Sequence, residues 1–234
     1  MVEDDAFDIH GIRVPCDRSV LTDLLIKQLS GGWFEVDEVT ALKKILRPSD
    51  RVLDVGGGLG VTSAVAAKVA GVTSVTTFEP NPFTQTFLRT MFDHNEVTVD
   101  LREGIILRQP TNEPRDFYAR PHIYGSSLYD RGDGSGKVVK VRAFGLAEVL
   151  TEVRPTVISC DIEGGEIELL TGAALPGVRA VIVEVHPDIS GQPAIDTMLA
   201  HLASIGLKLV PKLTTHDVKV LQRSPFDLRR LFHR

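Results

Sequence analysis

Glycine and acidic residues stand at spacings that suit a nucleoside cofactor. Gly56, Gly58 and Gly60 follow an apolar run. Glu79 closes a second apolar run about twenty positions later. Glycines let the backbone turn sharply after a buried strand and approach a ligand closely, and the helix that follows points its amide groups at an anionic group. An acid that ends the next parallel strand can accept hydrogen bonds from both ribose hydroxyls. We therefore predict a nucleoside cofactor at this turn.

The glycine spacing separates two cofactors that share this architecture. A dinucleotide fingerprint needs Gly-x-Gly-x-x-Gly, but the sixth position holds valine counted from Gly56 and serine counted from Gly58. The pattern present is Asp54-x-Gly56-x-Gly58-x-Gly60, which resembles the S-adenosylmethionine loop of Rossmann-like methyltransferases. The methionine end of that cofactor carries an ammonium and a carboxylate, so an acid beside exposed amides suits it, whereas a pyrophosphate would be repelled.

A second acid-rich segment narrows the resemblance. Residues 159–166 read Ser-Cys-Asp-Ile-Glu-Gly-Gly-Glu, and residues 181–187 read Val-Ile-Val-Glu-Val-His-Pro. A strand that ends in Asp-x-Glu-Gly-x-Glu and a later strand that ends in Glu with a nearby His-Pro resemble the FkbM family of methyltransferases. The resemblance covers roughly residues 32–190, because further segments agree in the family's order, namely residues 32–35, 52–56 and 78–82.

The resemblance implies an S-adenosylmethionine-dependent enzyme that methylates hydroxyl groups on macrolides, sugars and other small or glycosidic acceptors. It implies an α/β, Rossmann-like fold with a mostly parallel seven-stranded sheet, a C-terminal antiparallel hairpin and helices on both faces. We expect a small hydroxylated molecule as the partner, and neither nucleic acid nor membrane. The residues expected to bind the cofactor are Glu35, Asp54, Gly56, Gly58, Gly60, Glu79, Pro80, Asn81, Gly104 and Asp161.

Two residues are candidates for the catalytic base. Asp161 and His186 follow adjacent predicted strands, at the edge where ligands of open α/β sheets bind. We prefer His186, because its ordinary pKa lies near neutrality, whereas a carboxylate needs desolvation or a like-charged neighbour to become comparably basic. The alternatives are that His186 is a strand-end residue bonded to a loop, and that Asp161 contacts the cofactor or caps a helix.

The chain departs from the family pattern in ways that bear on charge. Ser159 stands where family members often carry a lysine, so the nearby carboxylates lose a cation. Their charge must then be balanced by another group, or their affinity for protons will rise. Gly57 replaces a usual alanine, which is a mild change. The acid usually found before the fourth strand is absent from the segment 144–147, which reads Phe-Gly-Leu-Ala.

Several acids near the end of the predicted fourth strand raise the question of a divalent cation. They are Asp161, Glu163, Glu166 and Glu184. Acids at a helix start are explained by the macrodipole and the unpaired amides there, and no Cys/His cluster suggests zinc. We therefore predict no metal.

Apolar runs and helical patterns alternate along the chain, which is typical of a parallel sheet covered by helices. Near the C-terminus a short polar connection separates two strand-like runs, which predicts an antiparallel hairpin from 207–213 and 218–223. The other expected strands are 51–55, 74–79, 97–101, 156–161 and 180–185. The expected helices are 20–29, 36–46, 59–70, 82–94 and 166–172.

We divide the chain into an N-terminal helical cap, residues 1–47, and a methyltransferase domain, residues 48–234. Within that domain, residues 108–137 are too polar for a core and too long for an ordinary connection. We expect a long loop or lid there. Its aromatic side chains either line an acceptor pocket or attach the loop to the surface, and they are Phe117, Tyr118, Tyr124 and Tyr129.

Composition and charge limit the possible settings. The 234 residues are 43% hydrophobic, which suffices for a sizeable core, and the net charge of -5 does not promise the basic face of a general nucleic-acid binder. Two cysteines, no basic start and no apolar N-terminal segment predict a cytoplasmic protein without signal peptide or membrane span. The alternatives left open are a nicotinamide-dependent oxidoreductase and a non-catalytic Rossmann-like binding protein; the oligomeric state is also open.

Overall fold

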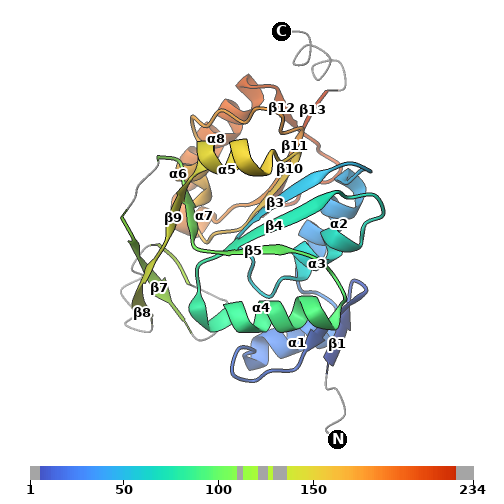
Figure 1. Cartoon of the computed structure of the whole chain (residues 1–234). Coiled ribbons are helices and arrows are strands. Elements are labelled where there is room, and N and C mark those ends of the chain that lie inside the picture. Colours follow the sequence, from blue (N-terminus) through green and yellow to red (C-terminus); the bar gives the residue numbers. More distant parts are fainter. Residues whose placement is uncertain (1–5, 110–112, 121–125, 129–135, 225–234) are drawn as a thin grey trace, which may run out of the picture.

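A seven-stranded sheet forms the centre of the molecule in the computed structural model, which describes residues 6–109, 113–120, 126–128 and 136–224 (Figure 1). The strand order is β12-β13-β11-β10-β3-β4-β5. This confirms the predicted Rossmann-like α/β sheet. The strands are β3 (Arg51–Val55), β4 (Ser74–Glu79), β5 (Asp100–Glu103), β10 (Val157–Cys160), β11 (Ala180–Glu184), β12 (Leu207–Leu209) and β13 (Val218–Arg223).

Strand directions place the carboxyl ends of five neighbouring strands along one edge. β10 pairs in parallel with both β3 and β11, and β4 pairs in parallel with both β3 and β5. β13 runs antiparallel between β11 and β12, which confirms the predicted C-terminal hairpin. In open sheets of this kind, ligands bind outside the carboxyl ends of the strands.

Helices cover both faces of the sheet (Figure 1). Successive strand residues point to opposite faces, so Val52 belongs to one core cluster and Leu53 to the other. The first face carries α1 (Asp23–Gly31), α2 (Val36–Ile45), α3 (Val61–Lys68) and α4 (Pro82–His94). The second face carries α5 (Leu146–Val153), α6 (Glu166–Leu170) and α8 (Gln192–Ser204), and α7 (Pro187–Ser190) lies between β11 and α8.

Local chemistry explains where the site helices begin. The Asn81 side chain accepts a hydrogen bond from the Phe83 amide, and Pro82 occupies the first turn of α4, whose predicted limits are confirmed. α3 begins at Val61 rather than at residue 59, because Gly60 has a φ of 79° and ends the preceding loop.

Two sequence-based assignments differ from the structure. The N-terminal region contains an antiparallel hairpin that we did not predict, formed by β1 (Ala6–Ile9) and β2 (Ile12–Pro15) around a turn with positive φ at His10 and Gly11. The strand expected at 97–101 is wrong at its start, since β5 begins at Asp100. The Val97 amide instead donates to the Phe92 carbonyl at the end of α4.

In and around residues 108–137, the described part of the chain forms two pairs of strands. β6 (Ile105–Leu107) pairs in parallel with β9 (Ala143–Gly145), and β7 (Arg115–Ala119) pairs antiparallel with β8 (Lys137–Val141). Phe117 is buried in a small cluster between these pairs. Two of the aromatic residues singled out above, Tyr124 and Tyr129, lie outside the described residues.

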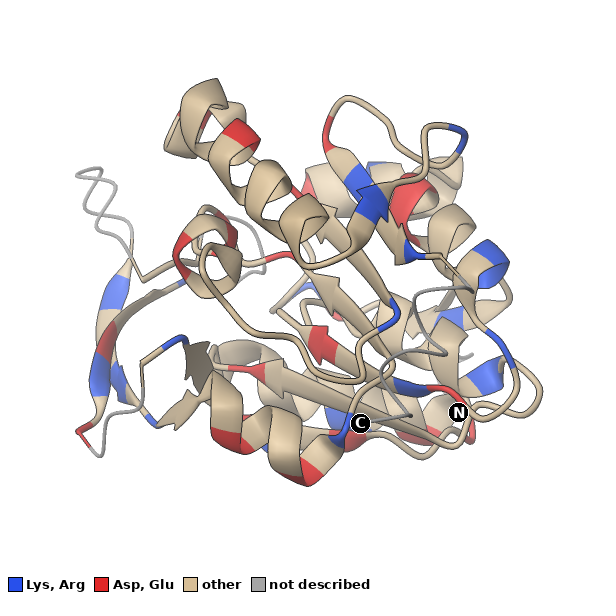
Figure 2. Ribbon diagram, turned by 90° about the horizontal axis from the view of Figure 1, so that it is seen from above, with Lys and Arg blue, Asp and Glu red and all other residues tan. Residues whose placement is uncertain are grey.

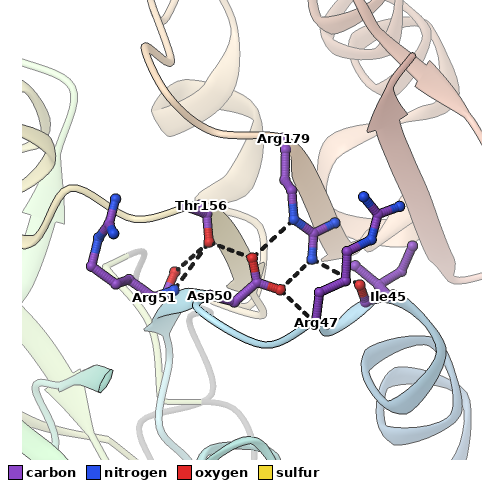
Figure 3. Close-up of polar contacts among 6 residues, drawn as sticks. All are labelled: Ile45, Arg47, Asp50, Arg51, Thr156 and Arg179. Carbon is purple, nitrogen blue, oxygen red and sulfur yellow. Dashed lines mark hydrogen bonds and ion pairs between the residues drawn. The ribbon is translucent and has the colours of Figure 1, made fainter. Parts of the chain in front are cut away.

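A buried ion pair joins the amino ends of three neighbouring strands, at the edge away from the glycine turn (Figure 3). Arg179 Nε donates to Asp50 Oδ1 at 2.9 Å, and Arg179 Nη2 donates to Asp50 Oδ2. The Thr156 hydroxyl donates to Asp50 Oδ1 at 2.7 Å. The arginine lowers the pKa of Asp50 despite the opposing effect of burial. The ion pair therefore links the amino ends of β3, β10 and β11, at the edge of the sheet opposite the cavity.

Charged residues are interspersed over the helices and strands, and Figure 2 shows basic and acidic positions side by side on both layers. In the part of the chain that the structure describes, no helix is long and apolar enough to span a bilayer.

Candidate active site

A cavity of about 530 Å³ lies at the carboxyl ends of β3, β4, β10 and β11. Apolar side chains of Phe78, Ile105, Ile106 and Phe117 form part of its wall. The residues predicted to bind the cofactor that line it are Glu35, Gly56, Gly58, Glu79, Pro80, Gly104 and Asp161. Four predicted site residues are not among those that line it, namely Asp54, Gly60, Asn81 and His186.

The glycine turn after β3 is shaped for close approach of the backbone. Gly56 has a φ of 95°, and a Cβ atom there would lie 1.8 Å from the Asp161 carbonyl oxygen. Gly58 has a φ of 55° and nothing nearer to its Cβ position than Glu35 Oε1 at 3.9 Å. A side chain at either position would strain the backbone, and at Gly56 it would also clash with the loop after β10, so the turn requires glycine.

Asp54 lies beneath this turn. Its carboxyl group is buried and accepts hydrogen bonds from Ser63 Oγ at 2.6 Å and Thr77 Oγ1 at 3.3 Å. Burial raises its pKa to about 6, although hydroxyl donors, including that of Ser159, oppose the rise. The acid of the sequence motif thus fixes the start of α3 from below.

Glu79 connects the turn to the next strand. Its Oε2 accepts from the Gly58 amide at 2.9 Å, and its Oε1 accepts from the Asn81 amide at 2.7 Å. Burial raises the pKa of Glu79 to about 7. The Asn81 amide group in turn donates to the Arg120 carbonyl at 2.8 Å. Two backbone amides thus hold the Glu79 carboxyl group in place at the cavity wall.

Glu35 brings the N-terminal helices into the site. Its φ of 50° places it in the left-handed region at the start of α2. Its Oε2 accepts from the Thr62 amide at 3.1 Å and from the Thr62 hydroxyl at 2.7 Å. Burial raises the pKa of Glu35 to about 8. This contact ties α2 to the first turn of α3.

Gly104 forms part of another side of the cavity. It has a φ of 149°, and a Cβ atom there would lie 2.4 Å from the Arg142 carbonyl oxygen. Its amide donates to the Glu79 carbonyl at 3.3 Å. The close crossing of two chain segments requires glycine here.

Three carboxyl groups meet at the opposite end of the cavity. Asp161 follows β10, Glu184 ends β11 and Glu38 lies on α2; Glu184 exchanges side-chain hydrogen bonds with both of the others. Burial and then the charges of Asp161 and Glu38 raise the pKa of Glu184 to about 10. Glu184 therefore carries a proton at neutral pH and can donate to Asp161.

Asp161 itself is 46% exposed in its side chain and lines the cavity. Desolvation raises its pKa to about 7; the charge of His186 opposes this shift, while those of Glu163 and Glu166 add to it. Without a lysine at position 159, we expected either another group to balance these acids or their pKa values to rise; the pKa of Asp161 is raised, and His186 offsets part of the negative charge.

His186 lies close to these acids but does not itself line the cavity. Its Nδ1 is 3.2 Å from Glu166 Oε1, and its Nε2 is 3.6 Å from Asp161 Oδ1 and 3.8 Å from Glu163 Oε2. Burial lowers the pKa of His186, but the three carboxylates raise it more, to about 9. The imidazole is therefore charged at neutral pH and supplies a cation beside these acids.

One atom each from Asp161, Glu166 and His186 lies within 4.8 Å of the others, a spacing that metal ligands also show. Both Glu166 oxygens already accept from backbone amides of Ile162 and Gly164. The imidazolium and these carboxylates also explain the cluster as ion pairs among the side chains themselves. The absence of a metal stays a prediction.

Sequence reasoning missed three acids of the cavity, Asp37, Glu38 and Asp217. Glu38 follows Glu35 by about one helical turn, so the helical period could have placed both on one side of α2. Asp217 precedes β13, and only the sheet order brings it to the site.

The cavity lining is strongly acidic. Among the described residues that line it there is no Lys, Arg or His. The acids that line it are Glu35, Asp37, Glu38, Glu79, Asp161, Glu163, Glu184 and Asp217. Glu35 and Glu184 are protonated at neutral pH, and those acids of the wall that are ionised would repel an anionic ligand group.

Comparison with known proteins gives a family match over residues 54–209, to the methyltransferase FkbM domain. The hexuronic acid methyltransferase AglP of Haloferax volcanii is 29% identical over 205 residues, which cover 86% of this chain and 81% of the relative. A TehB-like SAM-dependent methyltransferase from Corynebacterium glutamicum is 12% identical, with a TM-score of 0.48 and coverage of 85% of this chain and 94% of that one. The ribosomal protein L11 methylase of Lactobacillus delbrueckii subsp. bulgaricus is 14% identical, with a TM-score of 0.46 and coverage of 80% and 78%.

Proposed function

This chain belongs to the FkbM family of S-adenosylmethionine-dependent methyltransferases, and on that premise we propose that it methylates a hydroxyl oxygen of an uncharged sugar or sugar-like molecule. The observation that carries the proposal is the carboxyl group of Asp161, which lines the cavity beside the glycine turn and has a pKa raised to about 7. Membership of this family disfavours the nicotinamide-dependent alternative.

The residues of the cavity fit the cofactor. The glycine turn lies at the cavity and packs so closely against the Asp161 carbonyl that only glycine fits at position 56, and Glu79 is fixed at the wall where ribose hydroxyls would donate. A volume of about 530 Å³ lies within the range of small-molecule sites. When bound, S-adenosylmethionine supplies a methyl group already activated for transfer.

The chain must position the acceptor, exclude water and remove one proton. We assign the proton to Asp161 rather than His186, because a base must be unprotonated and reach the acceptor. The charged imidazole of His186 does not line the cavity, whereas the Asp161 carboxyl group does. The apolar wall around Phe78 and Phe117 keeps the reacting end dry, which strengthens the effect of fixed charges.

Two observations support the acceptor class. The relative from Haloferax volcanii is named for a hexuronic acid, which points to a sugar. The acidic lining of this chain disfavours a carboxylate on that sugar. We therefore expect a neutral or amino-bearing sugar to be methylated in preference to the matching hexuronate.

A transfer assay with a radiolabelled methyl group tests the proposal. A panel should pair each neutral sugar with its hexuronate and its amino sugar, and mass spectrometry should identify the methylated oxygen. We expect kcat/KM for the neutral or amino member to exceed that for the hexuronate by about tenfold or more, equivalent to about 1.4 kcal/mol. Preference for the hexuronate, or transfer to nitrogen, would overturn it.

A further inference from the structure

The buried residue Glu166 serves two neighbours at once. Its Oε1 accepts from the Ile162 amide at 2.9 Å, and its Oε2 accepts from the Gly164 amide at 3.0 Å. The same Oε1 lies 3.2 Å from His186 Nδ1. One carboxylate with a side-chain exposure of 1% thus fixes both the loop after β10 and the imidazole.

The backbone around the imidazole is fixed as well. The His186 carbonyl accepts from the Ile189 amide at 3.0 Å and the Ser190 amide at 2.9 Å. Gly164 has a φ of 102°, and a Cβ there would lie 2.6 Å from Ile189 Cγ2. The loop after β10 therefore packs closely against the turn that carries His186, and Nε2 lies 3.6 Å from Asp161 Oδ1 and 3.8 Å from Glu163 Oε2.

We propose that the Glu166–His186 pair is a positioning unit, in which a protonated imidazole held by Glu166 orients the Asp161 carboxylate and sets its affinity for the proton of the acceptor. The proposal rests on the role of Asp161 proposed above. No bond to substrate is assigned to His186 or Glu166.

The charges that face Asp161 decide whether its pKa rises or falls when the imidazolium is removed. His186 favours the ionised form of Asp161, while the carboxyl groups favour the protonated form. Without the imidazolium, Asp161 would hold its proton to higher pH. The carboxyl groups that face Asp161 are Glu163 and Glu166 from the α6 side, Glu184 from β11 and Glu35 from the start of α2, with Glu38 beyond Glu184.

The test compares His186→Gln with His186→Lys, which keeps a positive charge. In His186→Gln we expect the acidic limb of the kcat/KM profile to move to higher pH by roughly one to two units. At pH values above that limb, turnover should return toward that of the wild type, and S-adenosylhomocysteine affinity should stay within about threefold. In His186→Lys, the positive charge is kept, so the acidic limb should return most of the way to its wild-type pH. The control His201→Gln removes a remote, half-buried histidine that contacts the Ala173 carbonyl, and should leave the profile unchanged.

Carbon-13 detected titration of the aspartate carboxyl groups in the ligand-free protein provides a readout independent of turnover. A raised midpoint for Asp161 in His186→Gln supports the pair even if no methyl transfer is found, in which case only the proposed function fails. An unmoved midpoint overturns the inference. Loss of turnover at every pH in both His186 variants would also overturn the inference and would favour His186 as the base. Loss of activity after removal of divalent cations by EDTA would overturn it as well.

Discussion

The substitution Gly56→Ala tests the glycine turn most sharply, because the structure shows both reasons for a loss of stability, the backbone conformation and a steric clash. A φ of 95° lies outside the conformations that alanine prefers, which costs about 1–2 kcal/mol. The new Cβ would lie 1.8 Å from the Asp161 carbonyl oxygen, a backbone atom that cannot rotate away. Overpacking of this kind costs about 1–3 kcal/mol. We expect a total loss of about 2–5 kcal/mol in the free energy of unfolding.

Gly177→Ala is the matched control. Gly177 has a φ of 77° and no atom within 4 Å of its Cβ position, so only the backbone term applies. Urea unfolding should show a loss of about 1 kcal/mol for this control and at least twice that for Gly56→Ala. Calorimetric titration with S-adenosylhomocysteine should show a loss of at least about tenfold in affinity for Gly56→Ala alone. Equal stability and equal affinity in the two variants would refute the reasoning.

Three further predictions concern charge. Asp50→Ala leaves Arg179 buried without its carboxylate and should cost about 3–5 kcal/mol in urea unfolding; a loss below about 1 kcal/mol would contradict a buried ion pair. The ligand-free protein should lose thermal stability from pH 6 to pH 9, because Glu35 and His186, with folded pKa values of about 8 and 9 against ordinary values of 4.5 and 6.5, keep protons that the unfolded chain has lost; a melting temperature that rises over this interval would be inconsistent. Glu35→Gln keeps an acceptor for Thr62 and should reduce that loss when both proteins are melted side by side, whereas an unchanged pH dependence would count against the buried charge.

Local patterns sufficed for the sheet and for most of the residues that line the cavity at the glycine turn, whose binding of the cofactor stays a prediction. Gly56 and Glu79 were found from their spacing, because the turn and the strand end impose requirements that neighbouring residues reveal. Asp54 was placed in the ligand site, but the structure puts its carboxyl group beneath the turn, in contact with Ser63 and Thr77. Which face a strand residue points to depends on the layers around it, and these are not visible in the strand itself.

The acid end of the cavity depended on long-range contacts. The sequence identified Asp161 and His186 as a pair, but their charges depend on Glu166, Glu184 and Glu38, which three different elements bring together. Our preference for His186 as the base used its ordinary pKa. A neighbour that only the tertiary structure supplies makes it a cation instead.

The most direct measurement of the central claim is the rate of methyl transfer by Asp161→Asn, measured with the best acceptor of the sugar panel and compared with cofactor affinity in the same variant. We predict that transfer falls by at least about 100-fold while S-adenosylhomocysteine binds within about threefold of the wild type. The control Asp217→Asn changes another acid of the cavity wall and should keep turnover within about fivefold of the wild type. Transfer by Asp161→Asn at a rate near that of the wild type would contradict the assignment of Asp161 as the base.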